Sequence, residues 1–221
     1  MQITAIIPIP NSKSRYRIYL DDEFAFVLYK GELRHYDIEI GNELTAETYQ
    51  EITTQILPKR AKNRAFHLLK NRRYTEKQIR DKLKQGEYND DNIDETITYL
   101  KSYNYINDEQ YAKDYISYHI NTKSRNRIYQ DLFKKGIPFE MSTTTYLGES
   151  SDHNVIPNTH LGESTTNTCQ DTEELERTQI HKWLEKKKYI KESADIKEKQ
   201  RLFGFLSRKG YSAEMIKTIL L

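Results

Sequence analysis

The sequence predicts a mainly α protein made of tandem three-helix repeats, with a small N-terminal β-hairpin or meander segment. Three observations lead to this fold class. Apolar residues alternate over residues 1–29, recur with a helical period from Pro58 onward, and then repeat one three-helix pattern further along the chain. A period of two is typical of strands and a period of 3.6 is typical of helices, while recurrence of a whole unit indicates a repeat protein.

Residues 1–57 are expected to form a β-rich segment with a trailing helix. An acidic turn at Asp21-Asp22-Glu23 separates alternating runs, as in a hairpin. A short helix is predicted over Gly31–Tyr36, and Thr45, with Thr48 three positions later, predicts a second helix start. The strand residues are Ile3, Ala5 and Ile7 in the first run, Tyr16, Ile18 and Leu20 in the second, and 24–28 in the third.

Residues 58–106 are predicted to form the first three-helix repeat. Thr75 and Asn89 stand where helix N-caps are expected. The apolar residues have the i, i+3, i+4, i+7 spacing of a buried helix face. They are Ala61, Ala65, Leu68 and Leu69, then Ile79 and Leu83, then Ile93, Thr96, Ile97 and Leu100. A unit of this size buries too little surface alone, so we expect neighbouring repeats to stack.

The pattern of the second and third helices recurs in residues 107–141 and 176–221. Each copy has an apolar pair four residues apart, another residue five positions later, and then a helix-start residue. These sets are Ile79, Leu83, Tyr88 and Asn89; Ile128, Leu132, Ile137 and Pro138; and Leu202, Leu206, Tyr211 and Ser212. Gly136 and Gly210 stand where a left-handed C-cap is expected. The first copy has Glu87 there, with Gly86 one residue earlier.

Residues 142–175 interrupt the repeats. The segment is rich in Thr, Ser and Asn, is acidic, and has few apolar residues at a useful spacing. Such a composition is typical of a disordered polar insertion. The third helix of the second repeat is therefore expected to be missing or degenerate. Helical structure is expected to resume with Ile180, Trp183 and Leu184.

Charge is strongly segregated along the chain, although the net charge is only +2. Residues 58–137 contain 18 basic and 11 acidic side chains, and residues 176–221 contain 12 and 6. Between these blocks, residues 138–175 contain seven acidic side chains and no Lys or Arg. Segregated charge attracts an oppositely charged partner over a long range. The basic blocks therefore indicate a nucleic-acid-associated partner.

The composition and the motif search exclude several classes of protein. A single cysteine, Cys169, excludes an intramolecular disulfide and favours a reducing, cytoplasmic compartment. The sequence has no apolar run of the ~18 residues that a membrane span needs, and its N-terminus lacks the basic start of a secretory signal. It contains no phosphate-binding glycine motif, nucleophile elbow or zinc-protease motif. We therefore expect no cofactor and no enzymatic activity.

Three segments together resemble the RecX regulatory family, whose members modulate the RecA recombinase. These segments are RAFHLLKNRRYTEKQIRDKL, YINDEQYAKDYISYHINTKSRNRIYQDLFKKGI and KQRLFGFLSRKGYSAEMIKTIL. The resemblance covers residues 58–141 and 176–221, and its strength lies in the order and spacing of the segments. The N-terminal YRIYLDDEFAFVL also resembles the extra segment of longer family members.

The resemblance implies tandem three-helix repeats in an elongated, curved array. It also implies a protein that binds in the groove of the RecA filament on DNA and inhibits recombination, ATP hydrolysis and coprotease activity, with roles in DNA repair and the SOS response. We expect a monomer that binds DNA itself only weakly. The family brings no catalytic residues and no cofactor. Residues 142–175 depart from its pattern, because a regular member has the third helix of its second repeat there.

Basic residues recur on equivalent helices of the repeats, and we expect their side chains to line up along one shared surface. These are the predicted contacts with the partner nucleoprotein: Arg72, Arg73, Arg80, Lys84, Lys123, Arg125, Arg127, Lys134, Lys135, Arg201, Arg208 and Lys209. Such cations contact phosphates or acidic patches. Lys134-Lys135 and Arg208-Lys209 also have an alternative interpretation, because the helix dipole stabilises cations in a last turn.

Other candidate sites favour structural interpretations. Tyr111, Tyr115 and Tyr118 are able to stack on bases, but their helical spacing favours packing. Asp90-Asp91 stands in a first helical turn, where acidic groups are stabilised, and this interpretation is favoured over a carboxylate pair for metal chemistry. A metal site made of His153, His160 and Cys169 has only weak support from their spacing.

Two other functions remain open from the sequence. One is a direct DNA-binding protein of helix-turn-helix type, against which the tandem repetition counts. The other is a scaffold repeat protein for an acidic partner. Binding to duplex DNA without recombinase would favour the first, and salt-insensitive binding to a protein partner would favour the second.

Overall fold

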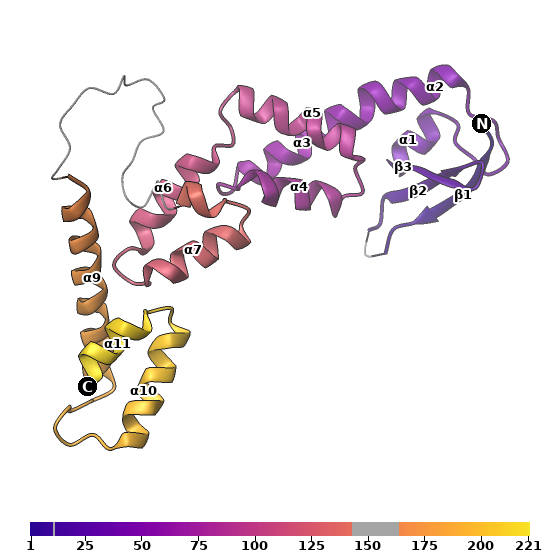
Figure 1. Ribbon diagram of the computed structural model, residues 1–221. Coiled ribbons are helices and arrows are strands. Elements are labelled where there is room, and N and C mark those ends of the chain that lie inside the picture. The colour runs from indigo at the N-terminus through magenta and orange to yellow at the C-terminus, as the bar shows by residue number, and fades with distance from the viewer. Residues whose placement is uncertain (11, 143–163) are drawn as a thin grey trace. The chain divides into compact units, whose positions relative to one another are not determined.

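The computed structural model describes residues 1–10, 12–142 and 164–221 as two compact units, Met1–Asn107 and Asp108–Leu221 (Figure 1). For residues 164–172 the structure describes the backbone alone. The fold is mainly helical with a three-stranded antiparallel sheet at the N-terminus, as the sequence predicts. Within the described ranges, no helix is long and apolar enough to cross a membrane.

The N-terminal sheet is a meander in the order β1-β2-β3. Its strands are β1 (Ile3–Pro8), β2 (Arg15–Leu20) and β3 (Glu23–Tyr29). Asp21 and Asp22 form the two-residue turn with φ of 47° and 68°, a conformation that short acidic side chains tolerate and tight hairpins need. Glu23, expected in the turn, begins β3 instead, because it pairs with Leu20.

The short helix that follows the sheet is α1 (Lys30–His35). The sequence placed this helix over Gly31–Tyr36, one residue too late. The difference arises at its start, where the backbone N–H of Tyr29 donates to the Glu32 carboxylate at 2.6 Å. An acidic side chain at the third helical position often fixes the start in this way.

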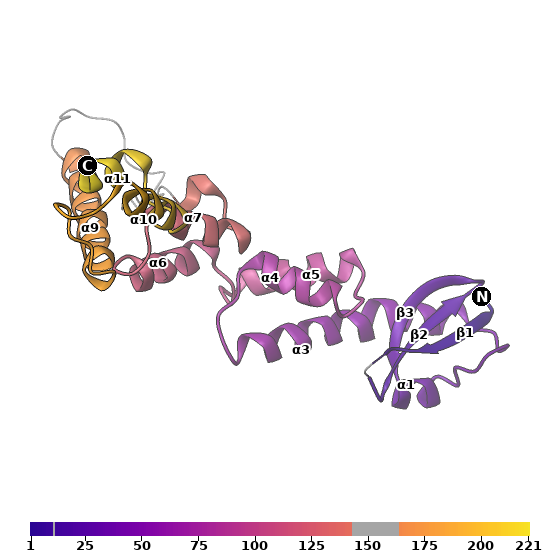
Figure 2. The ribbon, with the colours of Figure 1, turned by 90° about the horizontal axis from the view of Figure 1, so that it is seen from below.

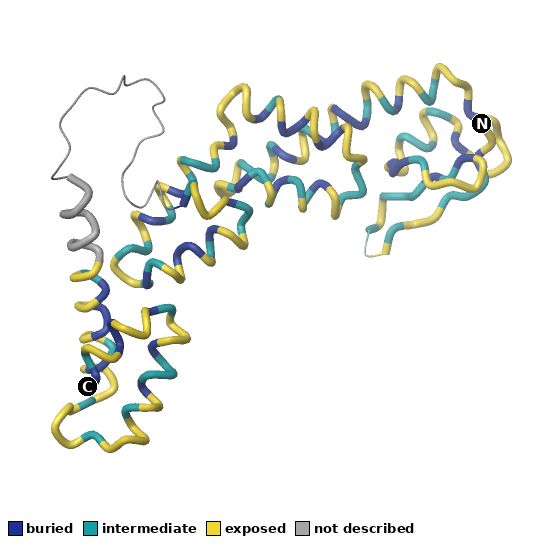
Figure 3. The backbone as a smooth tube through the Cα atoms, in the orientation of Figure 1, coloured by how far each residue is buried: buried dark blue, intermediate teal, exposed yellow. Residues whose placement is uncertain are grey.

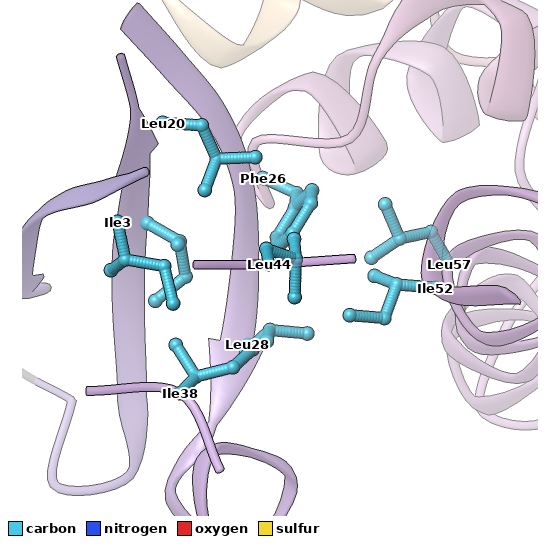
Figure 4. Packing of buried hydrophobic residues seen from close by; sticks show 9 residues of the cluster. Ile3, Leu20, Phe26, Leu28, Ile38, Leu44, Ile52 and Leu57 are labelled. Atoms are coloured by element: carbon cyan, nitrogen blue, oxygen red, sulfur yellow. The ribbon is translucent and has the colours of Figure 1, made fainter. Parts of the chain in front are cut away.

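One continuous helical stretch joins the sheet to the first repeat. It consists of α2 (Ala46–Glu51), the π-helical segment η1 (Ile52–Ile56) and α3 (Leu57–Leu69). Thr45 caps its start as predicted, because its hydroxyl accepts the Thr48 N–H at 3.1 Å. Leu57 belongs to the apolar cluster under the sheet (Figure 4), whereas Ala61 and Ala65 belong to the core of the first repeat. The change of sequence pattern near Pro58 therefore lies inside a helix.

Repeat 1 consists of α3, α4 (Glu76–Lys84) and α5 (Asp90–Ser102), which pack against one another (Figures 1 and 2). Thr75 and Asn89 cap α4 and α5, as the sequence predicts. The predicted apolar residues of α4 and α5 are all buried, namely Ile79, Leu83, Ile93, Thr96, Ile97 and Leu100. Asp90 and Asp91 occupy the first turn of α5, which agrees with their structural interpretation.

Repeat 2 contains α6 (Asp108–His119), α7 (Arg125–Lys134) and a helical stretch that covers residues 139–142. Tyr111 and Tyr115 pack against its core, as predicted. The same prediction is wrong for Tyr118, whose side chain is 80% exposed. The buried line of α6 runs through Ala112 and Ile116, and a residue two positions after Ile116 lies about 200° around the helix.

Repeat 3 consists of α9 (Ser164–Lys186), α10 (Ile196–Arg208) and α11 (Ala213–Leu220). The prediction that 142–175 lacks regular structure is wrong at both ends, because Ser142 is helical and buried and α9 begins at Ser164. Once a helix has formed, each residue added to its end gains one hydrogen bond. The packed part of α9 therefore continues back into a polar sequence. Residues 143–163 lie outside the described residues.

The turn after the second helix has the same form in all three repeats. The hydrogen bonds that close it are Tyr88 N–H to Leu83 O, Ile137 N–H to Leu132 O, and Tyr211 N–H to Leu206 O, at 3.1 to 3.3 Å. The residue before the donor has a positive φ, which is 63° at Glu87, 92° at Gly136 and 94° at Gly210. Glu87 therefore takes the place of the glycine, and the predicted alignment of the repeats is confirmed.

Along the described helices of the three repeats, buried residues recur between exposed ones, as Figure 3 shows, whereas α1 and α2 contain no buried residue. The three repeats have separate apolar clusters rather than one common core. Polar contacts between neighbouring elements therefore decide where clefts form.

Candidate nucleoprotein interface

A cleft of about 400 Å³ lies between repeat 2 and repeat 3, inside the unit Asp108–Leu221. Four of its lining side chains are cationic, three are aromatic and two are hydroxylic. They are Thr122, Lys123, Ser124, Arg127, Trp183, Phe205, Arg208, Lys209 and Tyr211. None of these described lining residues is acidic. Four predicted contact residues are therefore brought together around one cavity.

One side of the cleft is built where the start of α7 meets the turn after α10. Ser124 caps α7 and also donates from its hydroxyl to the Lys209 carbonyl at 2.8 Å. Asn126 Nδ2 donates to the Gly210 carbonyl at 3.1 Å. A Cβ atom at Gly210 would lie 2.6 Å from Ser124 Oγ, so the close approach requires glycine. These contacts bring Lys123 and Lys209 to the same cleft.

The same two repeats are also joined through α9. The Arg125 N–H donates to Glu176 Oε1 at 2.6 Å, and Gln179 Nε2 donates to the Ile120 carbonyl at 2.6 Å. Burial raises the pKa of Glu176, although the hydrogen bond from the Arg125 N–H acts in the opposite direction. The α9–α7 contact removes water from this carboxyl group, which disfavours its charged form.

Tyr211 links the floor of the cleft to α9. Its hydroxyl donates to Gln179 Oε1 at 3.0 Å. Burial raises the pKa of Tyr211 to about 12, so the phenol stays neutral and keeps its donor role. Tyr211 is thus a structural element of the floor rather than an ionisable group of the site.

Lys123 and Arg127 share one carboxylate. The Lys123 ammonium donates to Tyr115 Oη at 2.8 Å and to Asp131 Oδ2 at 2.9 Å, and Arg127 Nε lies 3.4 Å from Asp131 Oδ1. Burial by itself lowers the pKa of Lys123, but the hydrogen bonds to Tyr115 and Asp131 outweigh it and raise the pKa above its usual value. Two cations facing one anion leave a net positive charge at the edge of the cleft.

An aromatic pair lines the same cleft as these cations. The rings of Trp183 in α9 and Phe205 in α10 meet edge to face with centroids 5.5 Å apart. The Lys209 ammonium lies 4.6 Å from the Trp183 ring centroid, and the Lys187 ammonium lies 5.0 Å from that of Phe205. Cations in such positions are attracted by the ring faces, so aromatic and cationic groups form one mixed surface.

A second cleft, of about 300 Å³, adjoins the first through shared residues. Phe205 and Arg208 line both clefts, and Arg201 and Lys187 line the second. Five of the predicted contact residues therefore gather on repeat 3 and the neighbouring edge of repeat 2. They are Lys123, Arg127, Arg201, Arg208 and Lys209.

The predicted contacts of repeat 1 have partners within their own unit. Arg80 binds Glu76 and Asp94, and Lys84 lies 3.1 Å from Asp90. The pairs with Asp94 and Asp90 connect α4 to α5, and the pair with Glu76 lies within α4. Both kinds of pair have a structural role. Arg72 lies with its guanidinium 4.4 Å from the Tyr74 ring centroid. Arg73 is exposed.

The remaining predicted contacts belong to repeat 2. Arg125 uses its backbone N–H to bind Glu176, Lys134 is exposed, and Lys135 lies over the rings of Tyr111 and Tyr115. None of the three lines either cleft. One cationic surface common to all three repeats stays a prediction.

The three residues that the sequence supports only weakly as metal ligands cannot be placed from the structure. His153 and His160 lie outside the described residues, as does the side chain of Cys169. In the part of the chain that the structure describes, no three His, Cys, Asp or Glu side chains form a group suited to a metal ion.

Sequence reasoning missed the aromatic part of the cleft. It treated Trp183 only as a marker of helix order and gave Phe205 no role. A signal was present, because the single tryptophan of the chain stands in HKWLEKKK, among four lysines. Aromatic residues interleaved with basic ones are a feature of nucleic-acid-binding surfaces.

Two family models match the chain. They are described as "RecX, first three-helix domain", over residues 61–100, and "RecX, third three-helix domain", over residues 174–220. The matched ranges fall in repeats 1 and 3. The second range contains Trp183, Phe205, Arg208 and Lys209, so most of the cleft belongs to matched sequence.

Curated relatives give the same result over longer ranges. The chain is 39% identical over 142 residues to "Regulatory protein RecX" of Caldanaerobacter subterraneus subsp. tengcongensis, which covers 64% of this chain and 72% of the relative. It is 30% identical over 222 residues to "Regulatory protein RecX" of Clostridium perfringens (strain 13 / Type A), which covers 99% of this chain and 94% of the relative.

Solved structures share the fold. A "Crystal structure of regulatory protein RecX" matches with a TM-score of 0.58 and 24% identity, over 99% of this chain and 98% of that one. A "Crystal structure of RecX from Lactobacillus salivarius" matches with a TM-score of 0.55 and 23% identity, over 75% of this chain and 95% of that one. At these identities the likeness concerns the fold.

Proposed function

Because the chain belongs to the RecX family of regulatory proteins, we propose that it binds the RecA-type recombinase filament on DNA and inhibits its activities. It is a regulatory protein rather than an enzyme. The activities expected to fall are DNA recombination, ATP hydrolysis and coprotease function. We propose that it acts in the cytoplasm as a monomer and needs no cofactor.

The observation that supports this proposal is the cationic cleft between repeats 2 and 3. Lys123, Arg127, Arg208 and Lys209 line it without any acidic lining residue. A nucleoprotein filament presents phosphates and acidic side chains, and a water-accessible cluster of cations attracts both. Inhibition then follows from occupancy, because several modest contacts made by linked repeats add up to stable binding.

The experiment is a titration of the DNA-dependent ATPase of the cognate recombinase with the full chain. The variant that tests the cleft is Arg127→Glu/Arg208→Glu, which reverses two of its charges. If each contact contributes about 1 kcal/mol or more, the concentration for half-inhibition should rise at least about tenfold.

A control variant, Lys191→Ala/Lys217→Ala, removes two exposed cations of the same repeat that line neither cleft. It should inhibit like the parent chain. The proposal fails if a saturating amount of the parent protein leaves ATPase, strand exchange and filament lifetime unchanged.

A further inference from the structure

We infer that the cleft between repeats 2 and 3 holds one unpaired nucleotide of a single-stranded nucleic acid, with its phosphate among the cations and its base against Trp183 and Phe205. The inference rests on the proposed function and deepens it by naming the ligand class of the cleft. It combines three observations: the size of the cavity, the cations that line it, and the aromatic pair that lines it beside them.

The size of the cavity suits a nucleotide. Its volume of about 400 Å³ falls in the range of roughly 300–1,000 Å³ that is typical of small-ligand sites. A phosphate alone would leave most of this space empty. The cavity is also part of the folded unit, because hydrogen bonds from Ser124, Asn126 and Gln179 hold its two sides together.

The cations at the edge suit a phosphate. Arg127 and Arg208 carry planar guanidinium groups, which bind phosphate oxygens in pairs. Lys123 and Lys209 add two ammonium groups. The nearest carboxylate partner, Asp131, is already shared between Lys123 and Arg127, and this leaves donors on both residues for an anion.

The aromatic pair suits a base. Trp183 and Phe205 meet edge to face at the cleft, and single strands bind proteins by stacking bases on such rings. Lys209 now lies over the Trp183 face. A bound nucleotide places its phosphate against this ammonium and its base against the ring. The ammonium then exchanges the ring for a phosphate, and the ring exchanges the ammonium for a base.

The same features favour an unpaired strand over other polyanions. The bases of a duplex are stacked on one another, so a duplex offers the cleft phosphates but no free base. An acidic peptide would pair with the cations and leave Trp183 and Phe205 without a stacking partner. The aromatic half of the site therefore decides the choice of ligand.

The test uses the intrinsic fluorescence of Trp183, which is the single tryptophan in the chain. The full protein is titrated with a 12-nucleotide oligo-deoxythymidine, with the same strand paired to oligo-deoxyadenosine, and with polyglutamate. The single strand should change the fluorescence saturably and bind at least about tenfold more tightly than the other two. Because the cleft binds one phosphate, a fourfold rise in salt should weaken binding about twofold to threefold.

Two variants test the phosphate-binding part and the base-binding part of the site separately. Arg127→Ala/Arg208→Ala should weaken single-strand binding at least about tenfold, while Lys191→Ala/Lys217→Ala should stay within about twofold of the parent. Phe205→Leu keeps apolar bulk in the floor and removes a ring. It should weaken the single strand about fivefold or more and leave polyglutamate binding unchanged.

Opposite outcomes overturn the inference. Equal binding of the three polyanions would show charge attraction without a base site, and an unchanged fluorescence at saturating strand would show that the base does not reach Trp183. Recombinase inhibition is measured on the same samples. Inhibition without strand binding overturns the cleft assignment alone, whereas strand binding without inhibition overturns the proposed function alone.

Discussion

The turn after the second helix is a docking point in both units, but its partners differ. In repeat 1 the turn meets β2: Glu87 binds Arg17 through both carboxylate oxygens at 2.6 and 2.7 Å, and Gly86 O accepts from Arg15. In repeat 3 the turn meets the start of α7: the carbonyls of Lys209 and Gly210 accept from Ser124 and Asn126. One local structure therefore makes an ionic contact in one unit and a close backbone contact in the other.

The difference explains the residue at the position of positive φ. Gly210 is needed because α7 approaches its Cα closely. At Glu87 the neighbouring element is a strand whose arginine reaches across, so a side chain fits there and is needed. A non-glycine residue with a positive φ is strained by about 1–2 kcal/mol, and the ion pair with Arg17 offsets part of that cost. The neighbour thus determines which residue the turn tolerates.

The largest effect is expected from Gly210→Ala. The new Cβ would approach Ser124 Oγ to 2.6 Å and the Arg127 backbone nitrogen to 3.2 Å at a φ of 94°. We expect the free energy of unfolding of the unit Asp108–Leu221 to fall by about 2–4 kcal/mol. Urea denaturation followed by Trp183 fluorescence measures it.

The control is Gly204→Ala in the middle of α10. Its nearest neighbour is the flexible end of Arg208 at 3.3 Å, and alanine in a helix is more stable than glycine by about 0.5–1 kcal/mol. If Gly210→Ala and Gly204→Ala shift the urea midpoint equally, the close-approach account of the turn is wrong.

A smaller loss is expected from Ser124→Ala. Ser124 is buried, caps α7 and also donates to the Lys209 carbonyl across the two repeats. Ser212 caps α11 in the same unit but is exposed, with its side chain bonded to the Met215 N–H. We expect a loss of about 2 kcal/mol for Ser124→Ala and about 1 kcal/mol for Ser212→Ala. Equal losses in denaturation would argue against a contribution from the contact between repeats.

The next effect concerns the backbone at Glu87. Glu87→Ala and Glu87→Gly both remove the contact with Arg17, but only glycine also relieves the strain of the positive φ. We expect the glycine variant to be about 1 kcal/mol more stable than the alanine variant. Thermal unfolding of both variants gives the difference. An alanine variant as stable as the glycine variant would mean that the turn changes its conformation once the ion pair is lost.

The smallest effect is an opposite pH dependence of two contacts, that of Glu87 with Arg17 and that of Glu176 in α9 with the Arg125 N–H at the start of α7. The hydrogen bond and charge of Arg17 hold the pKa of Glu87 below its usual 4.5. The stability that the Glu87 carboxylate contributes is therefore present above pH 4.5 and is lost as the pH falls through the lowered pKa. Burial raises the pKa of Glu176, so its contribution is full below pH 4.5 and is lost as the pH rises through the raised pKa.

Urea denaturation at pH 7 and pH 4 tests both signs. The cost of Glu87→Gln should shrink toward pH 4. Glu176→Gln keeps an acceptor for the Arg125 N–H, so it should be more stable than the parent at pH 7 and equal to it at pH 4. If lowering the pH changed the stability of both variants relative to the parent in the same direction, the assigned pKa shifts of Glu87 and Glu176 would be wrong.

Local features of the fold were predictable where short-range patterns determine them. The caps at Thr75, Asn89 and Ser212 and the buried apolar pairs of α4, α7 and α10 follow from residues within one or two turns. The errors arose where an element is longer or shorter than its pattern. α9 extends back to Ser164 through polar sequence, and Tyr118 lies beyond the buried line of α6.

The candidate site was predictable only in part. The sequence drew attention to Lys123, Arg127, Arg208 and Lys209, because basic residues recur on equivalent helices. It also nominated Arg80 and Lys84, which the structure shows in ion pairs with Asp94 and Asp90. Lys123 and Arg127 also share a carboxylate, that of Asp131, but they line the cleft. Whether a paired cation lines a cleft or lies between two helices depends on residues from other elements, so charge counts do not separate the two cases.

The sequence by itself determined the helix caps, the buried apolar pairs and the alignment of the three repeats, because hydrophobic period, caps and turns act between residues close in the chain. The resemblance of three segments to a known family indicated the family. Only the tertiary structure decided that Glu87 faces Arg17, that Gly210 lies under Ser124, and that Trp183 shares a cleft with the cations. These contacts join residues 70 to 86 positions apart or elements of different repeats. They depend on how whole repeats pack, which no local pattern specifies.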